Sequence, residues 1–289
     1  HIQQDINAFR SSLVYDCIER AMDLVEGGSV YSADGGPTAG TISAGDSLAA
    51  LDEIVFNQKL LTMEQVLHAM STNYEDMETV PAGPEIRAIL LNKAPKFGND
   101  DERADKWVVE LEDYIGSSYR YKYRSSKYGK GPVPCCYSYS QSPVTGNIAF
   151  GKSIGATPDG RKAGQPVNNG ISPANGSEKK GATAACNSVM KLPSIWFQKG
   201  AIFNMRLSKG ALDTDENKEK VIAMIKVLFE NYGQQIQFNV VDNKVFKKAM
   251  EHPDEYKDLM VRVSGYSALF TSLSPECQMD VINRAELEL

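Results

Sequence analysis

The order of predicted elements indicates an α/β fold whose sheet lies only partly within this chain. Apolar residues recur at helical spacing through most of residues 5–114, whereas strand-like runs occur only within residues 201–263. Residues 133–181 separate these two regions and are rich in Gly, Pro, Ser, Asn and Thr. A chain with helices first, and strands mixed with helices later, fits this fold class.

The first region is predicted to be mostly helical because its apolar residues fall on one helix face. Residues 5–24 show the spacing clearly, and Asp34-Gly35-Gly36-Pro37 then breaks it. The small, polar residues 38–45 are predicted to form a loop, and the basic, Tyr-rich run 119–130 a solvated helix end. The other helices predicted here occupy residues 46–55, 62–71, 85–91 and 100–114.

The second region combines irregular structure with short strands and helices. Residues 133–181 contain few helix formers and are predicted to form a long loop, with which short strands are compatible. We expect this loop to be part of an active-site wall because ordering it costs conformational entropy. Within it, Pro158-Asp159-Gly160 predicts a turn, and Arg161 or Lys162 is expected to tie the loop down. The elements predicted after it are a strand at 201–207, a helix at 216–232, a strand at 235–241, short helices at 244–250 and from His252-Pro253, and an apolar run at 259–263.

The composition indicates a globular protein that acts on a small molecule or another protein. The 289 residues are 42% hydrophobic and carry a formal net charge of -6, with scattered Lys and Arg, which disfavours nucleic acid and membrane partners. No apolar run approaches the roughly 20 residues that cross a bilayer, so a cytoplasmic location is expected. The five cysteines lack metal-ligand spacing, so no metal site is predicted.

Three motifs in a fixed order carry a family resemblance. They are Gly155-Ala156-Thr157-Pro158-Asp159-Gly160-Arg161-Lys162-Ala163-Gly164, Gln237-Phe238-Asn239-Val240-Val241 and Val261-Arg262-Val263-Ser264-Gly265-Tyr266-Ser267. Together they resemble the C-terminal half of the glycyl radical enzymes, the superfamily of pyruvate formate-lyase, and residues 17–56 and 93–100 are similar to family segments too. Residues 165–173 and Ser264 resemble the dehydratase, lyase, decarboxylase and benzylsuccinate-synthase-like branches more than pyruvate formate-lyase itself.

The resemblance implies the second half of a ten-stranded α/β barrel with surrounding helices. It implies that residues 1–150 form the C-terminal, mostly helical part of the pyruvate formate-lyase-like barrel domain, and that residues 151–289 form the glycine radical domain. In the family fold, two five-stranded half-barrels enclose the reactive loops and protect the radical from solvent and oxygen. Because the chain starts with His1 rather than Met, we expect a segment of a longer enzyme that turns over no substrate by itself.

Gly265 is the residue that the resemblance assigns to radical storage. A backbone radical is stabilised between an electron-donating amide nitrogen and an electron-withdrawing carbonyl when the α carbon can flatten, and glycine has no Cβ to oppose this. The alternative is that Gly265 only permits a tight turn at a strand end. By the same resemblance, Arg262, Val263, Ser264 and Tyr266 support the radical loop through position and packing.

Enzymes of this family pass the radical from glycine to a cysteine, which in dehydratases and lyases lies upstream in a Cys-x-Glu pattern whose Glu is a general base. Cys17-Ile18-Glu19 has these letters, but its predicted helical setting and the segment after it match a family region beyond the cysteine loop. Cys135 and Cys136 resemble the adjacent pair of pyruvate formate-lyase, but they stand too near Gly265 in sequence. All three remain weak candidates, and the thiyl cysteine is expected outside this chain. Cys186 and Cys277 are expected to be small buried hydrophobes.

The predicted function is storage of an organic radical on Gly265 and its transfer to that cysteine, for hydrogen abstraction from a small molecule in C–C, C–O or C–N bond chemistry. The resemblance implies no bound cofactor, an anaerobic setting and an activating enzyme that uses S-adenosylmethionine. The expected partners are this activating enzyme, the missing N-terminal half or a partner chain with the cysteine, and the substrate; a homodimer is compatible with them. Two alternatives are a stand-alone glycyl radical subunit, or spare part, that docks on a partner chain without catalysing alone, and a purely structural α/β protein.

Overall fold

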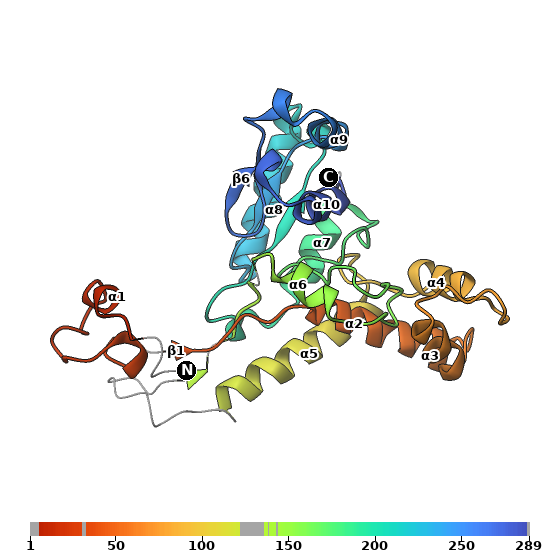
Figure 1. The fold of residues 1–289 in the computed structure, drawn as a ribbon, viewed down its shortest axis with the longest axis horizontal. Helices are drawn as coiled ribbons and strands as arrows, with labels where there is room; N and C mark the ends of the chain where they lie inside the picture. The colour runs from red at the N-terminus through yellow and green to blue at the C-terminus, as the bar shows by residue number, and fades with distance from the viewer. Residues whose placement is uncertain (1–5, 31–32, 122–135, 138, 143, 288–289) are drawn as a thin grey trace.

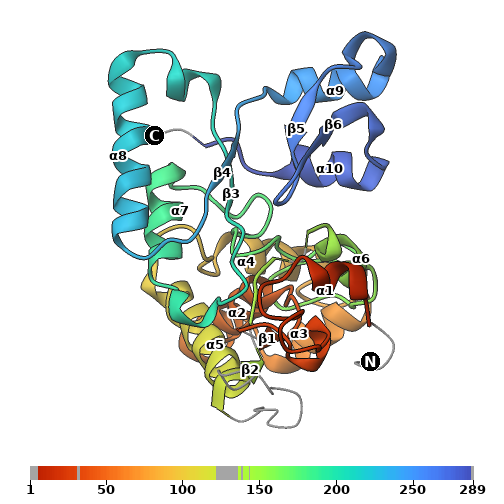
Figure 2. The same cartoon turned by 90° about the vertical axis from the view of Figure 1, so that its left-hand side faces the viewer.

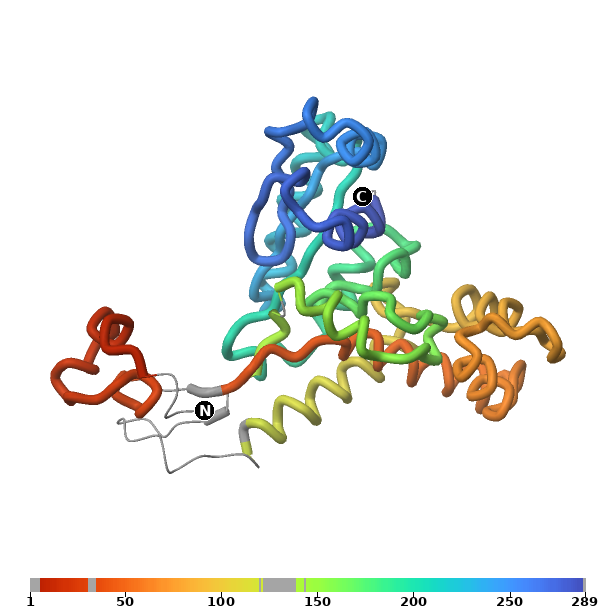
Figure 3. Tube along the Cα trace, in the orientation of Figure 1, coloured from red at the N-terminus to blue at the C-terminus, as the bar shows by residue number. Residues whose placement is uncertain are grey.

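The computed structural model describes residues 6–30, 33–121, 136–137, 139–142 and 144–287. Its helices are α1 (Ala8–Ser12), α2 (Thr41–Ala50), α3 (Met63–Ser71), α4 (Gly83–Asn92), α5 (Glu102–Tyr121), α6 (Gly146–Lys152), α7 (Gly181–Met190), α8 (Asp215–Glu230), α9 (Asn243–Glu251) and α10 (Pro275–Asn283). Its strands are β1 (Ala33–Asp34), β2 (Cys136–Tyr137), β3 (Asn204–Arg206), β4 (Gln237–Asn239), β5 (Met260–Arg262) and β6 (Ser267–Leu269). Figures 1 and 3 show α1 at one end, α3 and α4 at the opposite end, and the C-terminal half above the middle of the chain.

Parallel pairing joins segments that lie far apart in the sequence. Strand β1 pairs with β2, and β3 pairs with β4 through the register Met205↔Phe238. A parallel bridge between Gln141 and Ala201 links the segment after β2 to the segment before β3. Parallel strands need long crossover connections, and helices supply most of them here. These pairings agree with the expected α/β architecture.

An antiparallel hairpin, β5–β6, packs on the C-terminal helices. Its register pairs Arg262 with Ser267. Val261 and Phe270 are buried in one cluster with residues of α9 and α10, and the Phe270 ring lies 4.8 Å from the ring of Phe246. Figure 2 shows this hairpin, α9 and α10 on one side of β3 and β4, with α7 and α8 on the other. The hairpin is therefore anchored at its base and presents its turn away from this cluster.

Helices α2 and α5 lie against each other, below β6, α7 and α8 in the view of Figure 1. A Cβ added at Gly45 of α2 would lie 2.4 Å from Cγ2 of Val108 on α5 and 3.1 Å from the Val108 backbone. Only a residue without a side chain permits this approach. The last turn of α2 continues into a π-helix over Leu51–Asn57.

The helix predicted at residues 5–24 is wrong in most of its length. Helix α1 ends at Ser12, and the backbone then passes through left-handed conformations at Asp16 (φ 80°) and Ala21 (φ 50°). Such conformations are unfavourable for residues with a Cβ and cannot continue an α-helix. Most of the apolar stripe that predicted the helix is exposed in the chain, with Phe9 77% exposed, whereas Cys17 is buried.

The loop predicted at residues 38–45 is also wrong, because α2 begins at Thr41. Asp46 was expected to start this helix, but it lies buried inside it, and its Oδ1 accepts a hydrogen bond of 2.7 Å from the backbone N–H of Phe97. The long segment 133–181 contains α6 in addition to irregular structure, and α7, β6 and α10 were not predicted. The helices predicted at residues 62–71, 85–91, 100–114, 216–232 and 244–250 are confirmed, with shifted ends. The strands predicted at 201–207 and 235–241 are confirmed as β3 and β4, which are shorter. The run 119–130 lies largely outside the described residues.

Candidate radical site

Gly265 lies in the turn of the β5–β6 hairpin. The turn is closed by a hydrogen bond of 2.9 Å from the Val263 N–H to the Tyr266 carbonyl. Gly265 adopts a φ of 77°, a left-handed conformation that suits glycine, and a Cβ added there would lie 3.2 Å from Cδ1 of Ile202. Gly265 as a residue is exposed in this chain, although Ile202 lies close to its α carbon.

Arg262 and Gln237 hold the two peptide groups of Gly265. The Gly265 N–H donates to Oε1 of Gln237 at 3.2 Å, and the Gly265 carbonyl accepts from Nη2 of Arg262 at 3.1 Å. The two side chains are joined, because Nε of Arg262 donates to the same Gln237 oxygen at 2.7 Å. The guanidinium also donates to Oγ of Ser267 at 3.2 Å. Arg262 therefore holds the turn by hydrogen bonds within the hairpin, and Gln237 of β4 holds it by a hydrogen bond from outside the hairpin.

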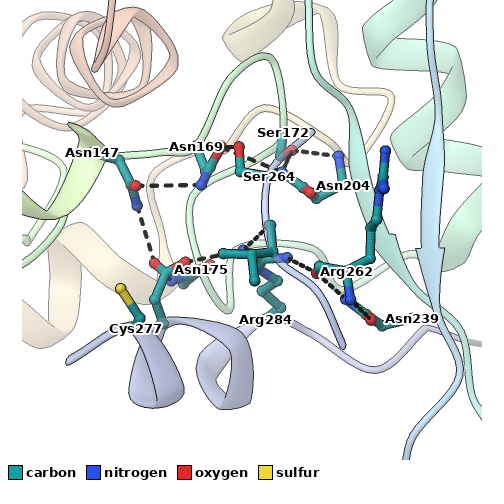
Figure 4. A network of polar contacts seen from close by, with 12 residues as sticks. Asn147, Asn169, Ser172, Asn175, Asn204, Asn239, Arg262, Ser264, Cys277 and Arg284 are labelled. Carbon is teal, nitrogen blue, oxygen red and sulfur yellow. Dashed lines mark hydrogen bonds and ion pairs between the residues drawn. The ribbon is translucent and has the colours of Figure 1, made fainter. Parts of the chain in front are cut away.

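Ser264 ties the turn to the segment between α6 and α7 (Figure 4). It is 1% exposed, and its hydroxyl donates to Oδ1 of Asn169 at 2.8 Å. The same Asn169 oxygen accepts from Nδ2 of Asn204 on β3, and Asn204 in turn accepts a short hydrogen bond from Nε2 of Gln237. The polar side chains around the turn are thus hydrogen-bonded to one another, as buried polar groups usually are.

The backbone before Gly265 is held by a second group of side chains. Asn239 accepts from the Arg262 N–H at 2.9 Å and donates to the Arg262 carbonyl at 2.7 Å. Arg284, just after α10, donates to the Val263 carbonyl at 2.7 Å and pairs with Asp280 at 3.1 Å (Figure 4). These contacts fix the direction in which the hairpin enters its turn.

Val263 and Tyr266 stand on either side of Ser264 and Gly265 in the sequence of the turn, and their side chains differ in exposure. Val263 is 2% exposed and packs in the hairpin cluster, whereas Tyr266 is 38% exposed. Partial burial, and to a lesser extent the charge of Cys277, raises the pKa of the Tyr266 hydroxyl. Cys277 is only partly buried, so the expectation that it is a buried hydrophobe is wrong, whereas Cys186 is buried as expected.

The Gly155–Gly164 motif forms a rigid turn, as its sequence predicts. Arg161, only 8% exposed, donates to backbone carbonyls of the loop, including that of Gln165 at 2.7 Å. Beside this loop lies a cavity of about 510 Å³ whose lining includes Asp46 and Lys96. Burial raises the pKa of Asp46 to about 7, although the positive charge of Lys96 partly opposes the shift.

Of the cysteine candidates, only Cys17 has a described side chain, and the structure does not bring it to Gly265. Cys17 is buried in the turns after α1, a region that Figure 1 shows well apart from β6, and burial raises the pKa of its thiol. Cys136 lies in β2, where only its backbone is described, and Cys135 lies outside the described residues.

Several residues of this site were not singled out from the sequence. Asn169, Asn204 and Arg284 were not proposed for any role, and Gln237 and Asn239 were noted only as parts of a strand motif. The signal available in the sequence was that amide side chains alternate at Gln237 and Asn239, which places both on one face of β4. Their partners lie many residues away, so no local pattern indicates the contacts.

Neither a metal cluster nor a membrane span is found in the part of the chain that the structure describes. No three His, Cys, Asp or Glu side chains gather there in a way that could hold a metal ion. No helix in that part has both the length and the apolar character to cross a bilayer.

Comparison with known proteins gives consistent family matches. Residues 1–150 match the family model described as pyruvate formate lyase-like, and residues 167–271 match the model described as glycine radical. The chain is 38% identical over 278 residues to a probable dehydratase, YbiW, of Escherichia coli, and 35% identical over 280 residues to trans-4-hydroxy-L-proline dehydratase of Clostridioides difficile. Each alignment covers 96% of this chain but only 34% and 33% of the relative.

The fold is likewise that of solved proteins of this kind. The glycerol-bound B12-independent glycerol dehydratase of Clostridium butyricum superposes with a TM-score of 0.88 at 36% identity, over 100% of this chain and 35% of that one. The chain therefore spans about a third of the length of the relatives it matches. The family models, the sequence relatives and the fold together show that this chain belongs to the glycyl radical enzymes of the pyruvate formate lyase-like family.

Proposed function

We propose that this chain is the radical-bearing part of a glycyl radical enzyme and that Gly265 stores the unpaired electron. The observation that carries the proposal is the position of Gly265, at an open hairpin turn within the segment that matches the glycine radical model. Its N–H and carbonyl are both held by side chains, while its α carbon bears no substituent. Loss of one α hydrogen would leave a radical between a donating nitrogen and an accepting carbonyl.

In this proposal residues 1–150 belong to the pyruvate formate-lyase-like barrel domain and residues 151–289 to the glycine radical domain. A ten-stranded barrel would be completed by the part of the enzyme that this chain does not include. That part would also supply the cysteine, which gives its thiol hydrogen to Gly265 and becomes the thiyl radical that attacks the substrate. Arg262, Val263, Ser264 and Tyr266 would hold the turn for this transfer.

The named relatives favour dehydration of a small hydroxylated molecule among the reactions of the family. Two of them are called dehydratases, and a third similar protein is a glycerol dehydratase. We therefore propose C–O bond cleavage, ahead of C–C or C–N cleavage. A radical S-adenosylmethionine enzyme would install the radical by taking one α hydrogen from Gly265, in an anaerobic cytoplasm.

The test is anaerobic activation of the full-length protein that contains this chain, with its activating enzyme and S-adenosylmethionine. Electron paramagnetic resonance should show a doublet from the single remaining α hydrogen, and Gly265→Ala should abolish it. Exposure of the activated protein to air should then cleave the backbone at Gly265, as mass spectrometry would detect. A doublet that persists in Gly265→Ala would place the radical elsewhere.

A second candidate, a separate radical subunit or spare part, is favoured by the exposure of the hairpin turn. Gly265 is exposed in the turn, as are Met260 (53%) and Leu269 (41%) at the other end of the hairpin, so another protein surface is needed to shield a radical there. The size of the natural polypeptide in cell extract distinguishes the two candidates. A single polypeptide about three times as long as this chain supports the first; a polypeptide of this size supports the second.

A further inference from the structure

Five side chains form a continuous hydrogen-bonded chain that ends on the amide of Gly265. Gln237 donates to Asn204, Asn204 to Asn169 at 3.4 Å, Asn169 to Asn147 at 3.3 Å, and Asn147 to Oδ1 of Asp280 at 3.1 Å. All five are less than a tenth exposed. Figure 4 shows the part from Asn204 through Asn169 to Asn147, which crosses from β3 to the start of α6.

The direction of this amide chain is fixed at both of its ends. At one end, Oε1 of Gln237 faces two groups that can only donate, the Gly265 N–H and Nε of Arg262. At the other end, Nδ2 of Asn147 faces a carboxylate oxygen of Asp280 and the carbonyl of Val167, which can only accept. Every amide between them must therefore point its oxygen toward Gly265 and its nitrogen toward Asp280.

Hydrogen bonds that run in one direction polarise one another. Each amide whose N–H is engaged carries more negative charge on its oxygen, and such cooperativity strengthens each bond by about 10–30%. The carboxylate of Asp280 starts the series, so Oε1 of Gln237 becomes a stronger acceptor than an isolated amide oxygen. The low exposure of the chain keeps water from screening the effect.

We propose that Gln237, at the head of this amide chain, tunes the radical on Gly265. Its oxygen draws the N–H proton and so raises electron donation by the Gly265 nitrogen, while the cationic guanidinium of Arg262 makes the Gly265 carbonyl a stronger acceptor. Donation on one side and withdrawal on the other spread the unpaired electron away from the α carbon. Because Arg262 also binds Gln237, one contact sets the geometry of both effects. The inference rests on the proposed radical role of Gly265.

The tuning predicts a spectroscopic change of defined sign. In activated full-length protein with ¹⁵N-labelled glycine, Gln237→Met removes the acceptor at similar volume. The α-hydrogen splitting should then increase, the nitrogen coupling should decrease, and the radical content should fall about fivefold, as for the loss of one ordinary hydrogen bond. Gln237→Glu, a stronger acceptor, should decrease the splitting instead. Asn147→Leu interrupts the amide chain far from Gly265 and should increase the splitting by less than Gln237→Met does.

Asn239→Leu is the matched control, because Asn239 holds the Arg262 backbone without touching Gly265. It should lower the radical content but leave the splitting unchanged. If Gln237→Met yields no radical, the unmutated protein in D₂O provides the test. The amide deuteron of the radical glycine should show the reduced quadrupole coupling of a strong hydrogen bond. A quadrupole coupling equal to that of a free amide refutes the tuning.

The outcomes separate this inference from the function on which it rests. If the unmutated protein forms the Gly265 doublet and Gln237→Met leaves the splitting and nitrogen coupling unchanged, the tuning is wrong and the radical site stands. If the unmutated protein forms no doublet with a proven activating enzyme, both fall.

Discussion

Replacement of Arg284 by Met is expected to loosen the turn that carries Gly265. Arg284 is 7% exposed, donates to the Val263 carbonyl at 2.7 Å and pairs with Asp280 at 3.1 Å. Met preserves much of the volume but leaves a buried carboxylate and a buried carbonyl without this donor. Removing one partner of a buried ion pair typically costs about 3–5 kcal/mol. The cost falls on local opening of the hairpin, since Arg284 holds the Val263 carbonyl where the hairpin enters its turn.

Hydrogen exchange of the full-length protein measures this opening. A cost of about 3 kcal/mol corresponds to roughly 100-fold faster exchange across residues 260–269, because each 1.4 kcal/mol is a factor of ten. Lys152→Met is the matched control, because it breaks an ion pair with Glu276 that also connects to α10. Both side chains of this pair are more than half exposed, so its loss should cost at most about 1 kcal/mol. The double variant Arg284→Met/Asp280→Asn leaves no uncompensated charge and should recover part of the protection. If Arg284→Met changes the exchange no more than Lys152→Met does, the clamp assigned to Arg284 is wrong.

Three further predictions concern the scaffold. Gly45→Ala should destabilise the α2–α5 contact by about 1–3 kcal/mol in denaturant unfolding, with partial rescue by Val108→Ala, because a Cβ would lie 2.4 Å from Cγ2 of Val108; an unchanged midpoint would contradict the close approach. Burial raises the pKa of Asp46 to about 7, so the folded state keeps a proton that the unfolded state loses near pH 4. The free energy of unfolding should therefore fall by on the order of 4 kcal/mol as the pH rises from about 4 to 7. Asp46→Asn should make the free energy of unfolding less dependent on pH in this range. Phe270→Ala should cost about 3–5 kcal/mol, because the ring is fully buried against Phe246, and a loss below about 1 kcal/mol would argue against this packing.

Local patterns predicted the elements whose stability is itself local. Helix α8 was expected at residues 216–232 and runs from Asp215 to Glu230, because its apolar spacing and its Thr214 cap act within a few turns. The same spacing misled at residues 5–24, since periodicity does not report the left-handed residues Asp16 and Ala21 that end α1. Asp46 resembled a helix start because such residues often cap, yet here tertiary burial gives its carboxylate a distant partner.

The residues that surround Gly265 were predicted in part. The motif around Gly265 predicted the glycine and its neighbours, because that information lies in consecutive residues. The amide chain from Gln237 to Asp280 was not predictable, because its members come from five separate segments and an amide side chain in a strand or loop is more often a surface residue. The roles that the resemblance assigns to Gly265, Arg262, Val263, Ser264 and Tyr266 stay predictions.

The contacts that hold the Gly265 turn have a consequence for how the protein folds. Those that come from outside the hairpin connect residues 21 to 95 positions apart, from the Arg284–Val263 bond to the Ser264–Asn169 bond. Contacts of such long range form late, because the conformational entropy of closing each loop is lost before the contact contributes its favourable free energy. A growing chain on the ribosome can build α2 and α5 early, but it cannot fix this turn until Arg284 has been synthesised. The turn is therefore ordered near the end of folding, when most of the surrounding scaffold is already in place.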